Sequence, residues 1–225
     1  MTFHYHKGPL LNGNITVNLI WYGNFKPTQR AIISDFITSF HPPPNMKPNH
    51  QLSHGGILLA SITNSPIPRN PPPPTTTSTS STLSLSLAKQ VFHETYPLGK
   101  SLTNKTFCNL ASKGGKQVNI VLTASDVTVD GFCRSRCGTH GSSYISKTTP
   151  QKFTYIWVGN SETQCPGQCA WPFEQPIYGP QSPPLIAPNN DVGLDGMIIN
   201  WHLCWLDSDK PIWKWILPRP KRSSA

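Results

Sequence analysis

The chain has 225 residues, which is enough for one domain with a substantial hydrophobic core. Apolar residues make up 36% of it and charged residues 13%, and its formal net charge is +9. The positive charge sits in a basic tail, a proline-rich stretch and scattered single residues, so the sequence does not indicate a nucleic-acid-binding protein, and no apolar run reaches the roughly 18 residues that a membrane-spanning helix needs.

The first segment predicts a strand followed by a helix. Residues 14–23 alternate apolar with small polar side chains and end at a glycine, as a β-strand does. Residues 29–40 carry apolar side chains at helical spacing, and Thr28 precedes them as the expected N-cap. We therefore expect an α/β fold of the mixed α+β kind, with a mixed β-sheet, packed helices and a disulfide-tied, proline-rich loop face.

The periodic pattern stops after this helix and returns later. Ten of the 24 prolines lie between Pro42 and Pro74, where neither strand nor helix spacing is present. Alternation resumes at Leu83. The later elements are a short helix at 107–111, strands at 117–123 and 153–159, an extended piece at 127–129 that continues or pairs with a strand, and a helix entering at 191–200.

Four cysteines form two pairs with one spacing, Cys133 with Cys137 and Cys165 with Cys169. Disulfides in an oxidising compartment are the favoured interpretation, and the sequence does not choose among the three possible connectivities. A zinc site made of four thiolates, as in an intracellular zinc module, remains the alternative. The other two cysteines, Cys108 and Cys204, have no partner pattern.

Catalytic signals are weak. Asp126 and Asp130 flank a short strand and would lie about 13 Å apart by strand rise, too far for paired glycosidase carboxylates. We expect these carboxylates to bond backbone N–H groups at turns, and His140 to lie in a tight glycine turn. No metalloprotease, hydrolase, phosphate-loop or dinucleotide motif is present. The sequence therefore predicts a protein that is not an enzyme and needs no cofactor.

Two further sets of residues suggest surface chemistry. Asn14 and Asn104 each begin an N-glycosylation motif. Trp157, Trp171 and Tyr178 would be the binding aromatics of an alternative function, a carbohydrate-binding protein or hydrolase of the cell wall, but we expect such aromatic side chains to pack in the core or against loops.

Several long motifs resemble one plant family, the EXORDIUM (phosphate-induced protein) family. The similarity covers roughly residues 1–41 and 78–200. The motifs that carry it are 5–11 (YHKGPLL), 21–23 (WYG), 100–105 (KSLTNK), 121–133 (VLTASDVTVDGFC), 137–141 (CGTHG), 155–160 (YIWVGN) and 165–173 (CPGQCAWPF).

The resemblance implies a secreted, non-enzymatic protein of the apoplast that regulates growth and is linked to brassinosteroid response and carbon status. It implies an unknown wall or receptor partner, without nucleic acid or membrane insertion; the oligomeric state is not indicated. Members carry a signal peptide upstream of the tyrosine–histidine motif, and we expect this chain to start after it.

Two segments depart from the family pattern. The family has a tryptophan pair and a tyrosine pair after the first helix, whereas residues 54–63 read HGGILLASIT. Permissible codons for these residues, read two nucleotides later, spell the family segment, and the sequence from Asn200 onward behaves similarly. We therefore expect one domain over 1–200, with 42–77 out of frame or disordered and 201–225 an aberrant tail. The helix near Gly196 would then end after about one turn, and the literal chain would be unstable.

Overall fold

The computed structural model describes residues 13–40, 83–134, 136–145, 151–174 and 183–206. Most of the two departing segments, 42–77 and 201–225, lies outside this part of the chain, as does Tyr178.

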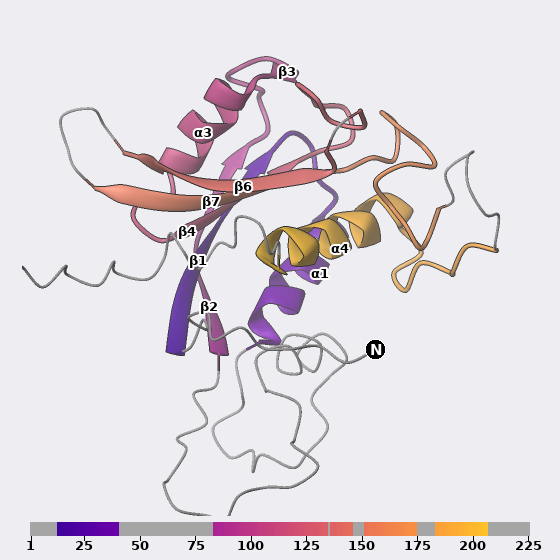
Figure 1. Cartoon of the computed structure of the whole chain (residues 1–225), viewed down its shortest axis with the longest axis horizontal. Helices are drawn as coiled ribbons and strands as arrows, with labels where there is room; N and C mark the ends of the chain where they lie inside the picture. The colour runs from indigo at the N-terminus through magenta and orange to yellow at the C-terminus, as the bar shows by residue number, and fades with distance from the viewer. Residues whose placement is uncertain (1–12, 41–82, 135, 146–150, 175–182, 207–225) are drawn as a thin grey trace, which may run out of the picture.

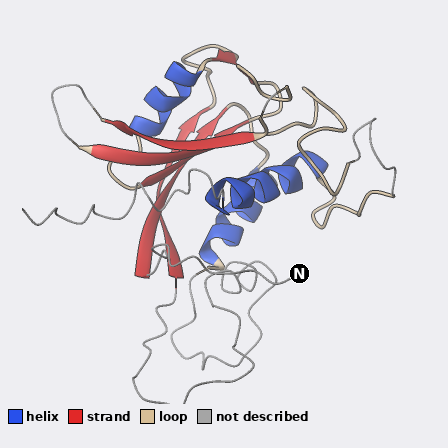
Figure 2. Cartoon of the chain, viewed as in Figure 1, coloured by secondary structure: helices blue, strands red, loops and turns tan. Residues whose placement is uncertain are grey.

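A five-stranded mixed sheet forms the centre of the fold (Figures 1 and 2). Its order is β2–β1–β4–β7–β6. The first four of these strands run parallel, and β6 pairs antiparallel with β7. The bounds are β1 Gly13–Tyr22, β2 Leu83–His93, β4 Val118–Thr123, β6 Gly138–Tyr144 and β7 Lys152–Gly159. This architecture confirms the expected mixed sheet with packed helices.

Two short strands form a separate small sheet. β3 (Ser101–Leu102) pairs in parallel with β5 (Thr128–Val129). The extended piece predicted at 127–129 is therefore a partner of β3 and does not continue β4.

Helices cover both faces of the large sheet (Figure 1). α1 (Pro27–Thr38) and α4 (Val192–Leu206) lie on one face, and α3 (Asn104–Ser112) lies on the other. The alternation of strand side chains explains this arrangement, because successive residues point to opposite faces. Ile120 and Leu122 of β4 face α1 and α4, whereas Trp157 of β7 stacks on Phe107 of α3 with ring centroids 5.6 Å apart.

The core includes one of the aromatic residues considered for carbohydrate binding. Trp157 is fully buried, and its indole N–H donates to Thr123 Oγ1 at 3.1 Å. Phe132 packs edge-on against the same indole with centroids 5.4 Å apart. This burial confirms the expectation that Trp157 packs in the core, where it fills the space between the sheet and α3, and it removes Trp157 from the alternative carbohydrate-binding function.

The start of α1 and the end of α4 differ from the predictions. Lys26, and not Thr28, is the N-cap of α1, because Pro27 takes the first helical position. Gln29 Oε1 accepts from the Lys26 backbone N–H at 3.0 Å. The expected break one turn after Gly196 is also wrong: α4 continues to Leu206, since residues 197–206 contain neither glycine nor proline.

The predicted glycine turn around His140 is a strand. Residues 138–144 form β6, with His140 opposite Ile156 of β7. A Cβ atom on Gly141 would lie 2.9 Å from the Tyr155 hydroxyl oxygen. Glycine is needed at that position for close approach of a ring, which the sequence alone could not separate from a turn.

Within the described residues, no helix combines the length and apolar character needed to cross a membrane.

Candidate functional site

The carboxyl ends of the four parallel strands meet at one edge of the sheet, which we call the carboxyl edge. It consists of the loops 23–26, 94–100, 124–127 and 160–171, together with residues 130–134 and 136–137, which lead into β6 opposite the end of β7. β2 lies on one side of β1, whereas β4 lies on the other side. The strand order therefore reverses at β1. Ligands of open α/β sheets bind in the crevice at such a reversal.

Left-handed backbone conformations gather near this edge. Among the residues that the structure describes, four other than glycine have positive φ, and all four lie in loops: Tyr96 (52°), Cys133 (66°), Cys169 (58°) and Asn190 (54°). Each conformation costs on the order of 1–3 kcal/mol and persists only where surrounding contacts hold it. Such a concentration of strained residues marks the loops of this edge as candidates for function.

Two disulfides hold these loops together. Cys133 is bonded to Cys165 and Cys137 to Cys169, with Cα–Cα distances of 5.9 and 5.1 Å. Both join the segment after β5 to the segment after β7. The first cysteine of one segment is bonded to the first of the other, and the second to the second. Because the four sulfurs are bonded in pairs, they do not form the thiolate zinc site that the spacing also allowed. Cys108 is a free, half-buried thiol.

Arg136 fixes the segment between the first two cysteines. Its guanidinium group lies over the rings of Phe107 and Trp157, 6.0 and 5.8 Å from their centroids. It also donates to Asn104 Oδ1 at 2.5 Å and to the backbone carbonyl of Asp130. Sequence analysis missed this residue, because its partners come from α3, β7 and the β5 turn.

Helix α4 supports the second cysteine segment. A Cβ atom on Gly196 would lie 2.9 Å from the Cys169 carbonyl oxygen, so glycine is needed for this close approach. Asn200 Nδ2 donates to the same carbonyl at 2.6 Å. Gly193 likewise packs against the Asn160 amide. The spacing of the two glycines on one helix face was the sequence signal for this contact.

Asp126 lies at the carboxyl edge in a cluster with Tyr96 and Lys100. The Tyr96 hydroxyl donates to Asp126 Oδ2 at 2.7 Å, and Lys100 Nζ lies 2.5 Å from the same oxygen. Burial opposes ionisation, but the bonds from Lys100 and Tyr96 and the Lys100 charge outweigh it and lower the pKa of Asp126. The hydrogen bond to Asp126 raises the pKa of Tyr96. The expected role of Asp126 as a backbone cap is therefore incomplete, since two side chains bind it.

The other predicted residues do not join this cluster. Asp130 is held through its backbone, with its N–H donating to the Leu102 carbonyl at 2.9 Å. His140 is half-buried in β6. Asn14 is exposed in β1, and Asn104 is exposed at the start of α3. The described residues contain no group of three or more His, Cys, Asp or Glu side chains placed to hold a metal ion.

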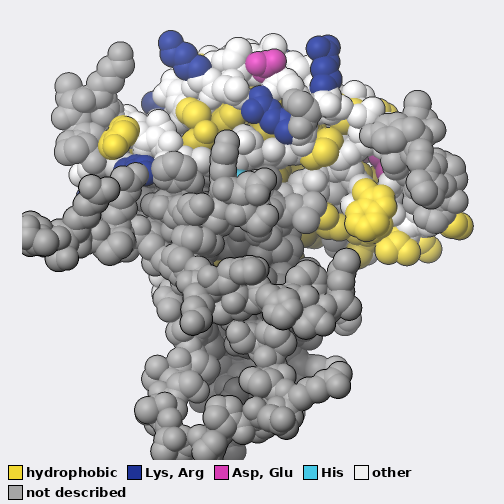
Figure 3. All heavy atoms as spheres, in the orientation of Figure 1, with side chains coloured by type: hydrophobic (Ala, Val, Ile, Leu, Met, Phe, Trp, Pro, Cys, Tyr) yellow, Lys and Arg dark blue, Asp and Glu magenta, His cyan; other side chains and the backbone are white. Residues whose placement is uncertain are grey.

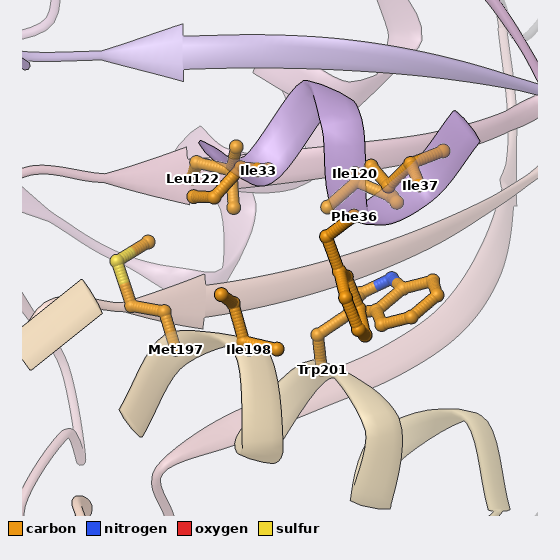
Figure 4. Close-up of a pocket in the computed structure, with 8 residues that line it drawn as sticks. All are labelled: Ile33, Phe36, Ile37, Ile120, Leu122, Met197, Ile198 and Trp201. Atoms are coloured by element: carbon orange, nitrogen blue, oxygen red, sulfur yellow. The ribbon is translucent and has the colours of Figure 1, made fainter. Parts of the chain in front are cut away.

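An apolar cavity lies between α1, α4 and the sheet (Figure 4). Its volume is about 10 Å³, room for a single water molecule. The residues that line it are all apolar: Ile33, Phe36, Ile37, Ile120, Leu122, Met197, Ile198 and Trp201. This cavity is a gap in helix packing with an almost entirely apolar lining, too small for a ligand beyond one water molecule.

An exposed apolar surface, which we call the Trp171 patch, adjoins the second disulfide. It consists of Trp171, Pro183, Pro184, Leu185 and Ile186, all exposed. Hydrophobic side chains gather in Figure 3 on the side where the segments after β7 run. Contiguous exposed apolar groups of this kind mark an interaction surface.

Comparison with known proteins gives consistent matches. Residues 3–204 match the family model described as the phosphate-induced protein 1 conserved region. The chain is 59% identical over 209 residues to Protein EXORDIUM of Arabidopsis thaliana, covering 87% of this chain and 62% of the relative. It is 58% identical over 203 residues to Protein PHOSPHATE-INDUCED 1 of Nicotiana tabacum, covering 87% and 60%.

A third relative extends the comparison. Protein EXORDIUM-like 1 of Arabidopsis thaliana is 51% identical over 213 residues, covering 88% of this chain and 63% of the relative. The chain thus spans about three fifths of the length of these relatives. No solved structure matches it.

Proposed function

The chain belongs to the phosphate-induced protein 1 (EXORDIUM) family, and from that premise we propose that it is a secreted, non-enzymatic regulator of plant growth and cell expansion. It acts in the apoplast and cell wall, in signalling linked to brassinosteroid and carbon status. Its partner is a wall component or a receptor.

The two disulfides support secretion. Disulfides persist in oxidising compartments, and cytosolic thiols are kept reduced. Cys133–Cys165 and Cys137–Cys169 lie in one loop region and hold conformations that free loops would not keep. The exposed asparagines of both glycosylation motifs are compatible with the same compartment.

The chemistry of Asp126 supports a role that is not catalytic. A general base works best when its pKa lies near the operating pH. The pKa of Asp126 moves in the opposite direction, because Lys100 and Tyr96 stabilise its carboxylate. This carboxylate is therefore suited to holding the loop after β2 against the loop after β4.

The observation that carries the proposal is the covalent locking of two loops at the carboxyl edge of the sheet, in a chain that matches the family over residues 3–204. Covalent locking reduces the conformational entropy that these loops lose when a partner binds. A rigid, exposed loop surface on a scaffold is how many recognition proteins present their binding residues.

Secretion and growth measurement test this function together. We expect the chain, expressed behind a signal peptide in plant tissue, to be recovered from apoplastic fluid and to increase cell expansion. A paired variant, Cys137→Ser with Cys169→Ser, should still be secreted because Cys133–Cys165 remains, but should promote less growth. Folded protein present in the apoplast without any growth effect would contradict the proposal.

A wall-carbohydrate function is the second candidate, and the exposure of Trp171 favours it. Aromatic faces provide large rigid contact area at small entropic cost. Of the other two candidate carbohydrate-binding aromatics, Trp157 lies in the core and Tyr178 lies outside the described residues. Binding of the purified chain to a glycan array, lost in Trp171→Ala, would establish this function.

The domain organisation is also a proposal. We propose that residues 1–200 form one family domain interrupted by an out-of-frame segment at 42–77, followed by an aberrant tail at 201–225. The genomic nucleotide sequence tests it. Alternative frames that lack the tryptophan pair and the tyrosine pair would refute the frame shift.

A further inference from the structure

The two edges of the large sheet differ in how they are protected. At the β2 edge, Ala88 and Lys89 lie opposite the single residue Asn18, which forms a β-bulge, and Lys89 is exposed. Bulges and lysines are devices that keep edge strands from pairing with other chains. The β6 edge has neither: its sequence GTHGSSY contains no Lys, Arg, Asp, Glu or Pro, and its pairing with β7 is regular.

No described strand pairs with the outer side of β6. Half of the backbone N–H and C=O groups of an edge strand point away from its sheet and can accept another strand. The residues of β6 are small except for His140 and Tyr144, so a further strand could approach the backbone closely.

The Trp171 patch continues this edge. The disulfide from Cys137, which directly precedes β6, reaches Cys169, two residues before Trp171. Exposed fractions are 67% for Trp171, 61% for Leu185 and 90% for Ile186. Within the described part of the chain, a strand edge that pairs with no further strand and an apolar surface thus lie close together.

The patch has a defined shape, because its two segments are tied together. Leu185 N–H donates to the Pro172 carbonyl at 2.9 Å and so joins the two segments, while Phe173 N–H donates to the Ala170 carbonyl at 2.8 Å and forms a turn within the first segment. The patch carries no charged side chain, although the whole chain has a net charge of +9. Its partner is therefore an apolar, uncharged segment that can adopt an extended conformation.

We propose that the β6 edge and the Trp171 patch form an interface for one occupant, the part of the family's polypeptide that lies outside the matched region. The relatives match this chain over only 60–63% of their own length. The remainder, close to two fifths of each relative, is long enough to supply both a strand and apolar side chains. In a relative it is covalently attached, so its effective concentration at this surface is high.

A complementation experiment tests the interface. The part of the tobacco relative outside the match is produced together with the 225-residue chain, and the two are purified through a tag on one of them. We expect a one-to-one complex in which backbone hydrogen exchange in β6 slows by at least about tenfold, while exchange in β2 does not change.

Matched variants distinguish specific docking from non-specific hydrophobic association. Ile186→Asp should weaken the complex by at least about tenfold, because it places a charge in an apolar contact. Phe92→Asp makes the same change at an exposed apolar residue of the β2 edge, which is 47% exposed, and should change affinity less than about threefold.

Three outcomes would overturn the inference. They are the absence of a complex, a complex that leaves β6 exchange unchanged, and a dimer of the chain alone with β6 protected, which would assign the edge to a second copy. None of them depends on growth activity, so failure here is distinct from failure of the proposed function.

Discussion

At the amino end of β4, the sheet is joined by buried side-chain amides. Asn18 Nδ2 donates to Asn119 Oδ1 at 2.9 Å, and Asn119 Nδ2 donates to the Gly115 carbonyl at 2.8 Å. Asn18 Oδ1 accepts from the Lys89 N–H at 3.0 Å, which satisfies the backbone of the β2 bulge. Three strands are thereby connected through side chains that are almost completely buried.

The carboxyl end of the same sheet is held by different chemistry. Two disulfides and the Lys100–Asp126 ion pair connect its loops. The ion pair is half-exposed, with 57% of the Lys100 side chain and 40% of the Asp126 side chain accessible.

The bonds at the two ends suit different roles: the amides fix the fold of the sheet, and the disulfides hold exposed loops in one conformation. Buried amides must find their partners as the sheet forms, since an unpaired one is costly. Disulfides let loops keep strained conformations close to solvent. We therefore expect the amino end to determine structural specificity and the carboxyl end to serve the recognition proposed above, and the following changes test that division.

Removal of both disulfides should have the largest effect. Each closes a loop between residues separated by 32 positions, but once one is present the second closes only a short additional loop. We expect the four-serine variant to lose roughly 5 kcal/mol of unfolding free energy, and Cys137→Ser with Cys169→Ser to lose roughly 2–3 kcal/mol. Urea denaturation measures both losses.

Non-reducing mass spectrometry provides the control, because the parent should show no free thiol at Cys133, Cys137, Cys165 or Cys169. Equal stability of the parent with and without reductant would contradict the covalent role of the carboxyl end. Stoichiometric zinc in the purified protein would support the alternative ligand set.

Loss of the central amide should be the next largest effect. Asn18→Ala leaves the Lys89 N–H, the Gly114 carbonyl and the Asn119 amide oxygen without this partner. We expect a loss of about 3 kcal/mol of unfolding free energy, unaffected by reductant. Asn109→Ala, at an exposed position of α3, is the matched control and should change stability by less than about 0.5 kcal/mol. Similar losses in the two variants would remove the contrast between the ends.

The sequence predicted elements whose side-chain period is local. β1, α1, β4 and β7 follow from alternation or helical spacing within about ten residues. It missed β6, because two glycines in seven residues suggest a turn unless Tyr155 is known to lie beside Gly141. Likewise the partners of Asp126 lie 30 and 26 residues earlier, at Tyr96 and Lys100. Disulfide connectivity also depends on which loops the fold brings together.

A smaller effect is expected where β7 ends. A Cβ atom on Gly159 would lie 2.7 Å from the ring of Phe132, which is buried against Trp157. Gly159→Ala should therefore cost about 1–3 kcal/mol of unfolding free energy through overpacking. Adding Phe132→Leu should make the double variant less destabilised than the sum of the single changes, as measured by a double-mutant cycle. Additive losses would show that this contact is not the cause.

The smallest effect should come from Asp126. Its pKa is lower in the folded protein than in the unfolded chain, because Lys100 and Tyr96 stabilise the carboxylate more than burial disfavours it. The folded state therefore binds fewer protons, and the stability that this group contributes is present above its unfolded pKa of about 4 and is lost as pH falls through the folded value. Asp126→Asn should lower Tm slightly at pH 7, and the difference from the parent should disappear in acid. Because both partners are half-exposed, solvent keeps the effect small.

Any loss of growth activity in Asp126→Asn should follow this loss of stability and of secreted yield, as it should for His140→Ala. If Asp126→Asn is secreted and melts like the parent but no longer promotes growth, the cluster binds a partner directly, and the carboxyl edge contains a functional site beyond its disulfides.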